Sequence, residues 1–504
     1  MEIHHYDAII VGSGFAGGVA ARELCDAGLK VLILEAGREI NPPTDIDPRD
    51  PWDRSYPLNN ERQPIQSKHL LCDEITKNIF IDDLANPYSI GDNPFMWFRS
   101  RIMGGRSLLW GKACFRMSKY DFKGWPISYD DLKPFYEKVE SWIGVQQSND
   151  QLEIIPDGGT AASSEWGEAG LLFKNTVEEN WKDRKVVLCR KATLNDTSQV
   201  SPPYSLCPQT TSPGFGLLPA LRTKNLTIQT NAVVRKILVN TDGKAHGVEI
   251  VDRITKKIRQ EKAPIIILGA STIESIRIMF NSACEQFPNG IGNSNGLLGH
   301  YVMDHIAGLS IGQIPKKLIN STTHNTKKEH IYIPNFSHGY GTMIDIKMIR
   351  STDEYYQYCA MVFGEVLPYW DNRVSINKNI VDECGIPVAH IDVKYKEKER
   401  KIILNAKNFI QSLAKLIGLN INYERFDEAI PGESIHEVGG ARMGTSKENS
   451  VLNNFNQCWD VRNLFVLDGS CFVSSGTQNP TLTIMAIAAR ASNFIINEYH
   501  KDRI

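Results

Sequence analysis

The sequence lacks long hydrophobic runs and a strong net charge. None of its apolar runs approaches the roughly 18 residues of a membrane-spanning helix. The 504 residues carry a formal net charge of −2, so there is no electrostatic basis for binding nucleic acid or an anionic membrane surface. We therefore expect neither a membrane span nor a nucleic-acid partner.

Signals of export and of metal or disulfide chemistry are also missing. The N-terminal stretch has no basic segment followed by an apolar core and a cleavage site of small residues. The ten cysteines are scattered and no two are spaced as C-x-x-C, so neither a zinc site nor a redox dithiol is indicated. We expect no metal site, reduced cysteines and a cytoplasmic protein, with export on a partner protein left open.

The composition is that of a globular protein, with 42% hydrophobic and 23% charged residues. A length of 504 residues exceeds what one hydrophobic core usually supports, so we expect two domains or one domain with a large inserted layer.

The first forty residues predict a strand–helix–strand unit. Residues 8–11, AIIV, are interpreted as a buried parallel strand. A helix rich in alanine is predicted over 16–27, and a second strand over 30–34. This order, with a glycine-rich turn before the helix, is typical of a Rossmann-type dinucleotide-binding unit.

Three glycines and one acid provide the binding chemistry of this unit. Gly12, Gly14 and Gly17 have the spacing G-x-G-x-x-G. Gly12 permits the tight turn, Gly14 lets backbone N–H groups reach a pyrophosphate at the helix start, and Gly17 allows close packing of helix and strand. Glu35, at the end of the second strand, can accept hydrogen bonds from a ribose hydroxyl. The motif alone does not separate NAD from FAD.

Four later segments favour FAD. Two of them, 263–282 and 463–492, are buried strands that end in a turn and lead into a helix; the others are a glycine-rich loop, 101–116, and a pair of β runs, 225–240. A proline near the start of the last helix suits a first turn with free N–H groups. The residues that these segments bring near a cofactor are Gly104, Gly105, Val233, Ala270, Asp468, Gly469, Asn479 and Pro480.

Residues 432–444 read GESIHEVGGARMG, in which His436 precedes a pair of glycines. Together with the dinucleotide unit, the segment 290–305 and the C-terminal DGS and NPTLT motifs, this block resembles the glucose–methanol–choline oxidoreductase family over essentially the whole chain. Within the family, HEVGGARMG with QNPTLT is similar to the pyranose oxidase and glycoside 3-dehydrogenase branch. The glucose oxidase branch carries a second histidine where this chain has Asn479.

The resemblance implies an FAD that lies across the first domain. Its ADP half would rest on Gly12, Gly14, Gly17 and Glu35, with the backbone of Val233 near the adenine. Its flavin would be held by Gly105, Asp468, Gly469 and the helix start at Asn479 and Pro480. Many pyranose oxidases attach the flavin covalently through a histidine. Leu109 stands at that position here, so non-covalent FAD is expected.

The resemblance also makes His436 the catalytic base and Asn479 its partner. Oxidation of an alcohol removes a hydroxyl proton and a hydride from one carbon, and a flavin takes the hydride. A neutral imidazole, with an ordinary pKa of about 6.5, suits the proton, and a carboxamide can orient the hydroxyl. The structural alternatives are a loop histidine and a helix N-cap. His300 and His305 are interpreted as structural.

The expected fold class is α/β, with a discontinuous Rossmann-type FAD-binding domain and a second α+β domain on a mostly antiparallel sheet. The FAD-binding domain is assigned residues 1–60, 95–125, 215–310 and 430–504, and the substrate-binding domain 126–214 and 311–429. The β-like runs between 330 and 400 predict an antiparallel sheet, and an amphipathic helix is predicted over 397–418. Residues 61–94 are predicted to be connections, a substrate lid or an oligomer arm.

The function expected from these features is FAD-dependent oxidation of a sugar or glycoside at C2 or C3 to a ketone. Oxygen, a quinone or an electron-transfer protein would accept the electrons. The alternatives are oxidation of a non-sugar alcohol, a non-redox lyase on the same scaffold, a flavin-binding subunit without turnover, and NAD-dependent dehydrogenation. A homo-oligomer is also left open.

Overall fold

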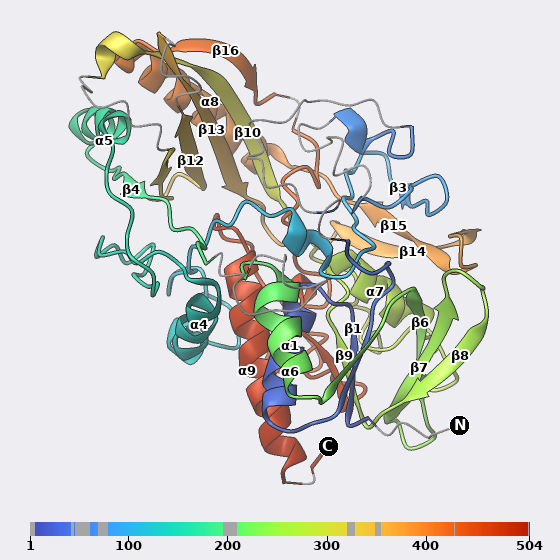
Figure 1. Cartoon of the computed structure of the whole chain (residues 1–504). Helices are drawn as coiled ribbons and strands as arrows, with labels where there is room; N and C mark the ends of the chain where they lie inside the picture. Colours follow the sequence, from blue (N-terminus) through green and yellow to red (C-terminus); the bar gives the residue numbers. More distant parts are fainter. Residues whose placement is uncertain are drawn as a thin grey trace.

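The structure is a computed structural model of the whole chain (Figure 1). It describes residues 6–41, 45, 61–68, 79–194, 209–319, 328–347, 354–427, 429–501 and 503–504. Residues 69–78, in the middle of the proposed lid or arm, therefore lie outside the described residues.

A five-stranded parallel sheet forms the layer that contains the dinucleotide motif. The strands are ordered β17-β9-β1-β2-β5, and every neighbouring pair is parallel. Their bounds are β1 Ala8–Val11, β2 Val31–Leu34, β5 Leu226–Gln229, β9 Ile265–Leu268 and β17 Leu464–Val466. Because each strand of β1, β2 and β9 is buried on both faces, its sequence is a continuous apolar run. The sheet joins segments from both ends of the chain.

Helices cover this sheet. The helix after β1, α1 (Phe15–Asp26), packs against α9 (Thr481–Tyr499), which in turn contacts α4 (Tyr129–Ile143) (Figure 1). A π-helical turn, Pro213–Leu217, leads into the short helix α6 (Leu218–Arg222) beside α1.

A second group of elements lies beside β2 and α7. Helix α7 (Thr272–Asn281) follows β9 and contacts β6. The strands β6 (Ala232–Val239), β7 (Ala245–Asp252) and β8 (Ile258–Lys262) form an antiparallel meander.

A six-stranded antiparallel sheet forms the other half of the molecule (Figure 1). Its order is β16-β10-β13-β12-β11-β4. The strands are β4 Val187–Leu188, β10 His305–Pro315, β11 Glu329–Ile333, β12 Tyr340–Lys347, β13 Tyr355–Glu365 and β16 Asn420–Arg425. Helices α5 (Glu168–Asn180) and α8 (Glu397–Ile417) pack against it and against each other. The expected combination of a Rossmann-type unit with a mostly antiparallel sheet is confirmed.

The prediction of a single sheet between residues 330 and 400 is wrong for two of its strands. β14 (Arg373–Val381) and β15 (Pro387–Asp392) form a separate three-stranded sheet with β3 (Ser89–Ile90), and β15 pairs with β3 in parallel. Alternation in the sequence indicates that a run is a strand, but β3, the partner of β15, lies 301 positions away in the sequence.

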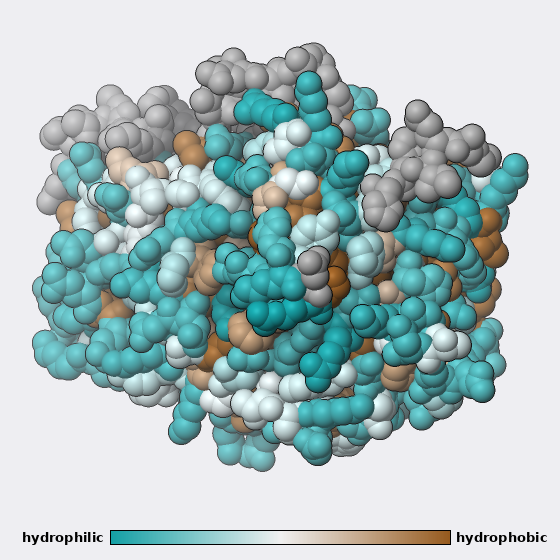
Figure 2. Space-filling view, turned by 90° about the horizontal axis from the view of Figure 1, so that it is seen from below, coloured by the Kyte–Doolittle hydropathy of each residue, from teal (hydrophilic) through white to brown (hydrophobic). Residues whose placement is uncertain are grey.

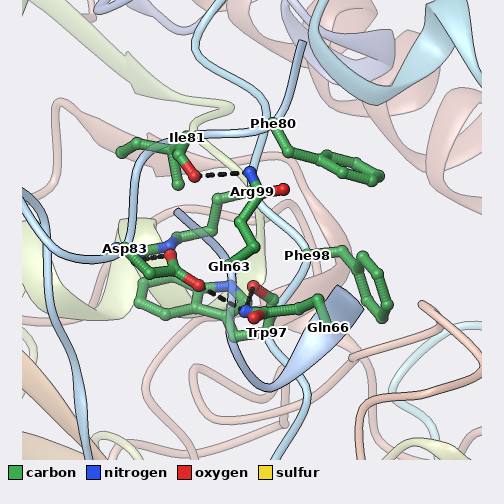
Figure 3. A pocket seen from close by; sticks show the side chains of 8 residues that line it. All are labelled: Gln63, Gln66, Phe80, Ile81, Asp83, Trp97, Phe98 and Arg99. Atoms are coloured by element: carbon green, nitrogen blue, oxygen red, sulfur yellow. Dashed lines mark hydrogen bonds and ion pairs between the residues drawn. The ribbon is translucent and has the colours of Figure 1, made fainter. Parts of the chain in front are cut away.

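The described parts of 61–99 are anchored in the body of the protein around Arg99 (Figure 3). The guanidinium of Arg99 bonds the carboxylate of Asp83 and lies 4.3 Å from the ring centroid of Trp97. The amide nitrogen of Gln66 donates to Asp83 at 2.6 Å and to the carbonyl of Trp97 at 3.0 Å. These side chains pack between residues 63–83 and residues 97–99. The described residues of this region are therefore part of the folded body of the protein.

The surface seen in Figure 2 is mostly hydrophilic, with hydrophobic residues scattered among the polar ones. Across the described residues, every helix is too short or too polar to cross a bilayer.

Gly17 provides a test of the strand–helix contact. A Cβ at this position would lie 2.0 Å from the carbonyl oxygen of Gly12, so neither backbone has room for it. We expect Gly17→Ala to lower the free energy of unfolding by about 1–3 kcal/mol, as overpacking does. Thermal unfolding measures this. Gly111→Ala is the matched control, because no atom lies within 4 Å of a Cβ there. Equal melting temperatures of Gly17→Ala and Gly111→Ala would contradict the close contact between Gly17 and the carbonyl of Gly12.

Candidate functional site

The glycine-rich turn between β1 and α1 has one open position. Gly12 has φ of +94°, and a Cβ there would lie 2.6 Å from the carbonyl oxygen of Gly269. Gly12 and Gly17 are therefore required by packing. Gly14 is different, because nothing lies within 4 Å of a Cβ built on it. Gly14 is also the N-cap of α1, and no side chain bonds the first N–H groups of this helix.

Glu35 lies buried at the carboxyl end of β2 and is tied to this turn. One carboxylate oxygen accepts from the hydroxyl of Ser13 at 2.5 Å and from its N–H at 3.1 Å. The other accepts from the N–H of Gly37 at 2.7 Å. Burial raises the pKa of Glu35 above its ordinary value, and these hydrogen bonds reduce that shift without cancelling it.

The loop with the second glycine pair faces the first turn. Gly104 donates its N–H to the hydroxyl of Ser13 at 2.9 Å, which joins the two loops. Gly104 and Gly105 have φ of +91° and +54°, in the left-handed region that favours glycine. A Cβ on Gly105 would meet only the Cα of Gly14, at 4.0 Å. Gly14 and Gly105 therefore lie close together, and the side-chain position of Gly14 is unoccupied.

The other residues expected around a cofactor lie at the same edge of the parallel sheet. Val233 is buried on β6, next to Ala232, whose N–H donates to the carbonyl of Glu35 at 2.9 Å. The N–H of Ala270 donates to the hydroxyl of Ser275 at 3.3 Å. Ser275 in turn bonds Asp468, which connects the turn after β9 to the turn after β17.

Asp468 and Gly469 stabilise the turn that follows β17. The second carboxylate oxygen of Asp468 accepts the N–H and the hydroxyl of Ser470, at 3.0 and 2.6 Å. Burial raises the pKa of Asp468. A Cβ on Gly469 would lie 2.7 Å from the hydroxyl oxygen of Thr272, so glycine is needed for this turn to pack on α7.

These features fit a dinucleotide. No protein atom lies within 4 Å of a Cβ built on Gly14, so a phosphate could approach the backbone on that side. Helix α1 begins there without a side-chain cap, and its N–H groups and dipole favour an anion. Helix α9 also begins without a side-chain cap, at Pro480.

The loop that carries His436 is held by the carboxylate of Asp304. One oxygen of Asp304 accepts the N–H of His436 at 3.0 Å and the hydroxyl of Ser434 at 2.6 Å. The other accepts the N–H of Gly432 at 2.8 Å. The loop is strained as well, because Ile435, a β-branched residue, has φ of +60°. Burial and the nearby charge of Glu437 raise the pKa of Asp304 to about 7.

The imidazole of His436 lies between Asn479 and His305. The amide nitrogen of Asn479 lies 3.1 Å from Nε2 of His436, and Nδ1 of His305 lies 2.9 Å from Nδ1 of His436. Because an amide nitrogen can only donate, Nε2 of His436 accepts and is unprotonated. The side chain of Asn479 is thus directed at His436, while Pro480 is the N-cap residue of α9. Nε2 of His436 can therefore accept a proton from a group that replaces the Asn479 amide as its hydrogen-bond partner.

The surroundings keep His436 neutral. Burial lowers its pKa well below 6.5, and the neighbouring His305 and the positive charge of Arg106 act in the same direction. Arg106 is held in place by hydrogen bonds to Glu437 at 2.7 Å and to Ser271 at 2.9 Å. A neutral imidazole is the form that can act as a base.

An apolar wall stands beside His436. The ring of Phe363, on β13 of the six-stranded sheet, lies 5.1 Å from the imidazole centroid to centroid. Leu109 packs with Ile435 against a buried cluster. The buried members of this cluster are Phe80, Met96 and Phe98. The anchored segment before residue 99 therefore supports both loops of the site.

Sequence reasoning overlooked Asp304 and the contact of His305 with His436. The interpretation of His305 as a structural residue is compatible with its burial, and the structure adds that its ring lies against His436. Asp304 was not singled out, although it holds the His436 loop through backbone N–H groups. Their only sequence signal is an acid–histidine pair at the start of a β run, in the segment 290–305 that contributed to the resemblance.

Family comparisons agree with this architecture. Residues 210–307 and 368–488 match two models described as GMC oxidoreductase. Residues 10–41 match the model of an NAD(P)-binding Rossmann-like domain. The three matches cover the dinucleotide turn, Asp304, His436 and Asn479.

Several curated proteins are similar to this chain at low identity. A 2-methyl-1,2-propanediol dehydrogenase of Mycolicibacterium austroafricanum is 25% identical, over 98% of this chain and 95% of its own length. A fructose dehydrogenase large subunit of Gluconobacter japonicus is 25% identical, over 98% of each chain. A C-glycoside 3-oxidase of Arthrobacter globiformis is 24% identical, over 53% of this chain and 52% of its own. With the matched family models and the geometry of the site, these relatives identify the chain as a member of the GMC oxidoreductase family, an enzyme of the class that oxidises CH–OH groups.

Proposed function

We propose that this protein is an FAD-dependent oxidoreductase that converts a secondary alcohol of a sugar or glycoside, at C2 or C3, into a ketone. The observation that carries the proposal is the convergence of Nε2 of His436 and the amide of Asn479, 3.1 Å apart, at the edge of a dinucleotide fold. Relatives named as fructose dehydrogenase and C-glycoside 3-oxidase support a carbohydrate substrate.

The proposed cofactor is non-covalent FAD. The N-terminus of α1 and the open space at Gly14 and Gly105 would hold the pyrophosphate, and Glu35 with the backbone of Val233 would face the adenosine half. Bound FAD would supply the acceptor for the hydride that leaves the substrate carbon. Leu109, an apolar side chain, offers no group for covalent attachment.

The chain's own part in the reaction is to bind, orient and deprotonate the substrate. Nε2 of His436 takes the hydroxyl proton as general base. The amide of Asn479, which donates towards the same point, would also orient the hydroxyl and stabilise negative charge as it develops on the oxygen. The ring of Phe363 would exclude water from one side of the site.

The six-stranded sheet would form the substrate half of the enzyme and the parallel sheet the cofactor half, in line with the division at residues 126–214 and 311–429. Oxygen, a quinone or an electron-transfer protein would then reoxidise the cofactor. The test is anaerobic stopped-flow measurement of flavin bleaching with monosaccharides, glycosides, polyols and simple alcohols. Bleaching by sugars or glycosides alone would support the substrate class. Bleaching only by simple alcohols would contradict it, and an unchanged spectrum with every compound would favour a non-redox lyase.

The open space at Gly14 provides a test of the cofactor site. We expect Gly14→Val to lower FAD affinity about tenfold or more, because the new methyl groups would occupy the space proposed for the pyrophosphate; a tenfold change is about 1.4 kcal/mol. The ratio of flavin to protein after dialysis measures this. Thermal unfolding of the FAD-free protein should be unchanged, since no atom lies within 4 Å of a Cβ there. A variant that stays fully loaded would rule out this position for the phosphate.

Replacement of His436 tests the base. We expect His436→Asn to slow flavin reduction by about 10²–10⁴-fold, the usual contribution of a general base, while FAD stays bound. Anaerobic stopped-flow absorbance measures the rate constant. His300→Ala is the control, because His300 lies outside the site, stacked on Trp370 at 3.6 Å. Undiminished reduction in His436→Asn would remove this residue as base.

The pH dependence follows from the lowered pKa of His436. A lowered pKa keeps the imidazole unprotonated below 6.5, so the base form persists into acid. We expect the rate constant of flavin reduction at saturating substrate to pass through pH 6.5 without the tenfold loss per pH unit of an ordinary histidine. Measurement from pH 5 to 8 tests this, and the ¹⁵N ring resonances of His436 over the same range separate its titration from that of Asp304, whose pKa is about 7. Protonation of the His436 ring centred near 6.5 would show that His436 is not shielded in this way.

A further inference from the structure

His305 lies directly behind His436 and is far more deeply buried. It is the first residue of β10 and only 1% of its surface is exposed, whereas His436 is only partly buried. The backbone of His305 is paired with Glu365 in the sheet. Its carbonyl accepts hydrogen bonds from Tyr395 and from Ser434, both at 3.0 Å. His305 is therefore a fixed point, out of reach of substrate.

The hydrogen bonds through these rings have one consistent direction. Asn479 donates to Nε2 of His436, so the neutral ring of His436 carries its proton on Nδ1. That N–H points at Nδ1 of His305, 2.9 Å away, which must accept it. The proton of His305 is then on its own Nε2, a buried atom that faces the backbone of Ser475 and Gly476.

We propose that His305 is a positioning residue that holds His436 in the tautomer with Nε2 unprotonated. This inference rests on the proposed role of His436 as base. Without an acceptor behind Nδ1, the proton of His436 could move to Nε2 and bond the other end of the Asn479 amide. The ring would then present a donor where the substrate hydroxyl needs an acceptor.

The partner is a neutral imidazole, which distinguishes this pair from a histidine held by a carboxylate. A carboxylate would raise the basicity of the ring and stabilise its charged form. Burial lowers the pKa of His305 to about 4, so His305 stays neutral and does not take over the proton that His436 receives. The other charged groups around the pair are Asp304, Arg106 and Glu437.

Two consecutive residues thus fix His436. The carboxylate of Asp304 takes its backbone N–H at 3.0 Å, and the ring of His305 takes its Nδ1–H. The first contact sets the position of the loop. The second sets the rotation of the ring and the location of its proton, on which proton abstraction depends.

The test compares His305→Leu, which removes the acceptor at similar volume, with His305→Asn, whose side-chain oxygen can occupy the place of Nδ1. For His305→Leu we expect flavin reduction to be slowed about 10²-fold or more. FAD content should be unchanged, and the substrate dissociation constant should change by less than about threefold. His305→Asn should recover most of the rate. Equal impairment of the two variants, or none in His305→Leu, would overturn the proposal.

The tautomer itself can be measured on the FAD-loaded protein with ¹⁵N-labelled histidine. The ring resonances of His436 are assigned by their loss in His436→Asn. We expect Nδ1 protonated and Nε2 unprotonated in the native protein and in His305→Asn, and the reverse in His305→Leu. Nε2 protonated in the native protein would overturn the proposal even if His305→Leu does not fold. This measurement needs no turnover: if no substrate reduces the native enzyme, the proposed function fails while the tautomer is still determined.

Discussion

The carboxylate of Asp304 is the contact on which the arrangement of the site depends. It accepts hydrogen bonds from the loop at Gly432, Ser434 and His436. The loop runs through a residue with positive φ, Ile435, so it would not hold this shape by local preference alone. A buried carboxylate with three donors compensates for that strain and for its own desolvation. The same contact brings the C-terminal part of the chain against the start of β10.

The site is assembled from distant parts of the chain because the parallel sheet combines them. β1 and β17 come from opposite ends of the sequence, and β9 lies between them. The turns after these three strands therefore end at one edge, where a ligand crevice is expected. Ser275 and Asp468 join two of those turns, and Ser13 joins the first to the loop at Gly104. Hydrogen bonds between turns thus give the cofactor site its rigidity.

Electrostatics in the site favour uncharged imidazoles. Burial lowers the pKa of both His305 and His436, and the cation Arg106 adds to the effect at His436. Arg106 is in turn paired with Glu437, so its charge is compensated close by. The result is an imidazole that stays unprotonated at neutral pH, which is the form that the proposed role of His436 as base requires.

Local sequence patterns were sufficient for the dinucleotide turn. The spacing of Gly12, Gly14 and Gly17 reflects contacts within a single strand–helix unit, and the structure has those contacts. Strands β1, β2 and β9 of the parallel sheet were equally readable, because burial on both faces makes each of them a continuous apolar run.

Tertiary structure alone decided which distant segments meet. The pairing of β15 with β3, the hold of Asp304 on the 432–436 loop and the contact of His305 with His436 all join residues more than 100 positions apart. Periodicity reports how exposed each residue is, but it contains no information about partners across such distances. By itself the sequence determined the nucleotide-binding unit and a candidate base, whereas the folded chain determined which residues hold that imidazole and in what orientation, because its orientation depends on hydrogen bonds from distant parts of the chain.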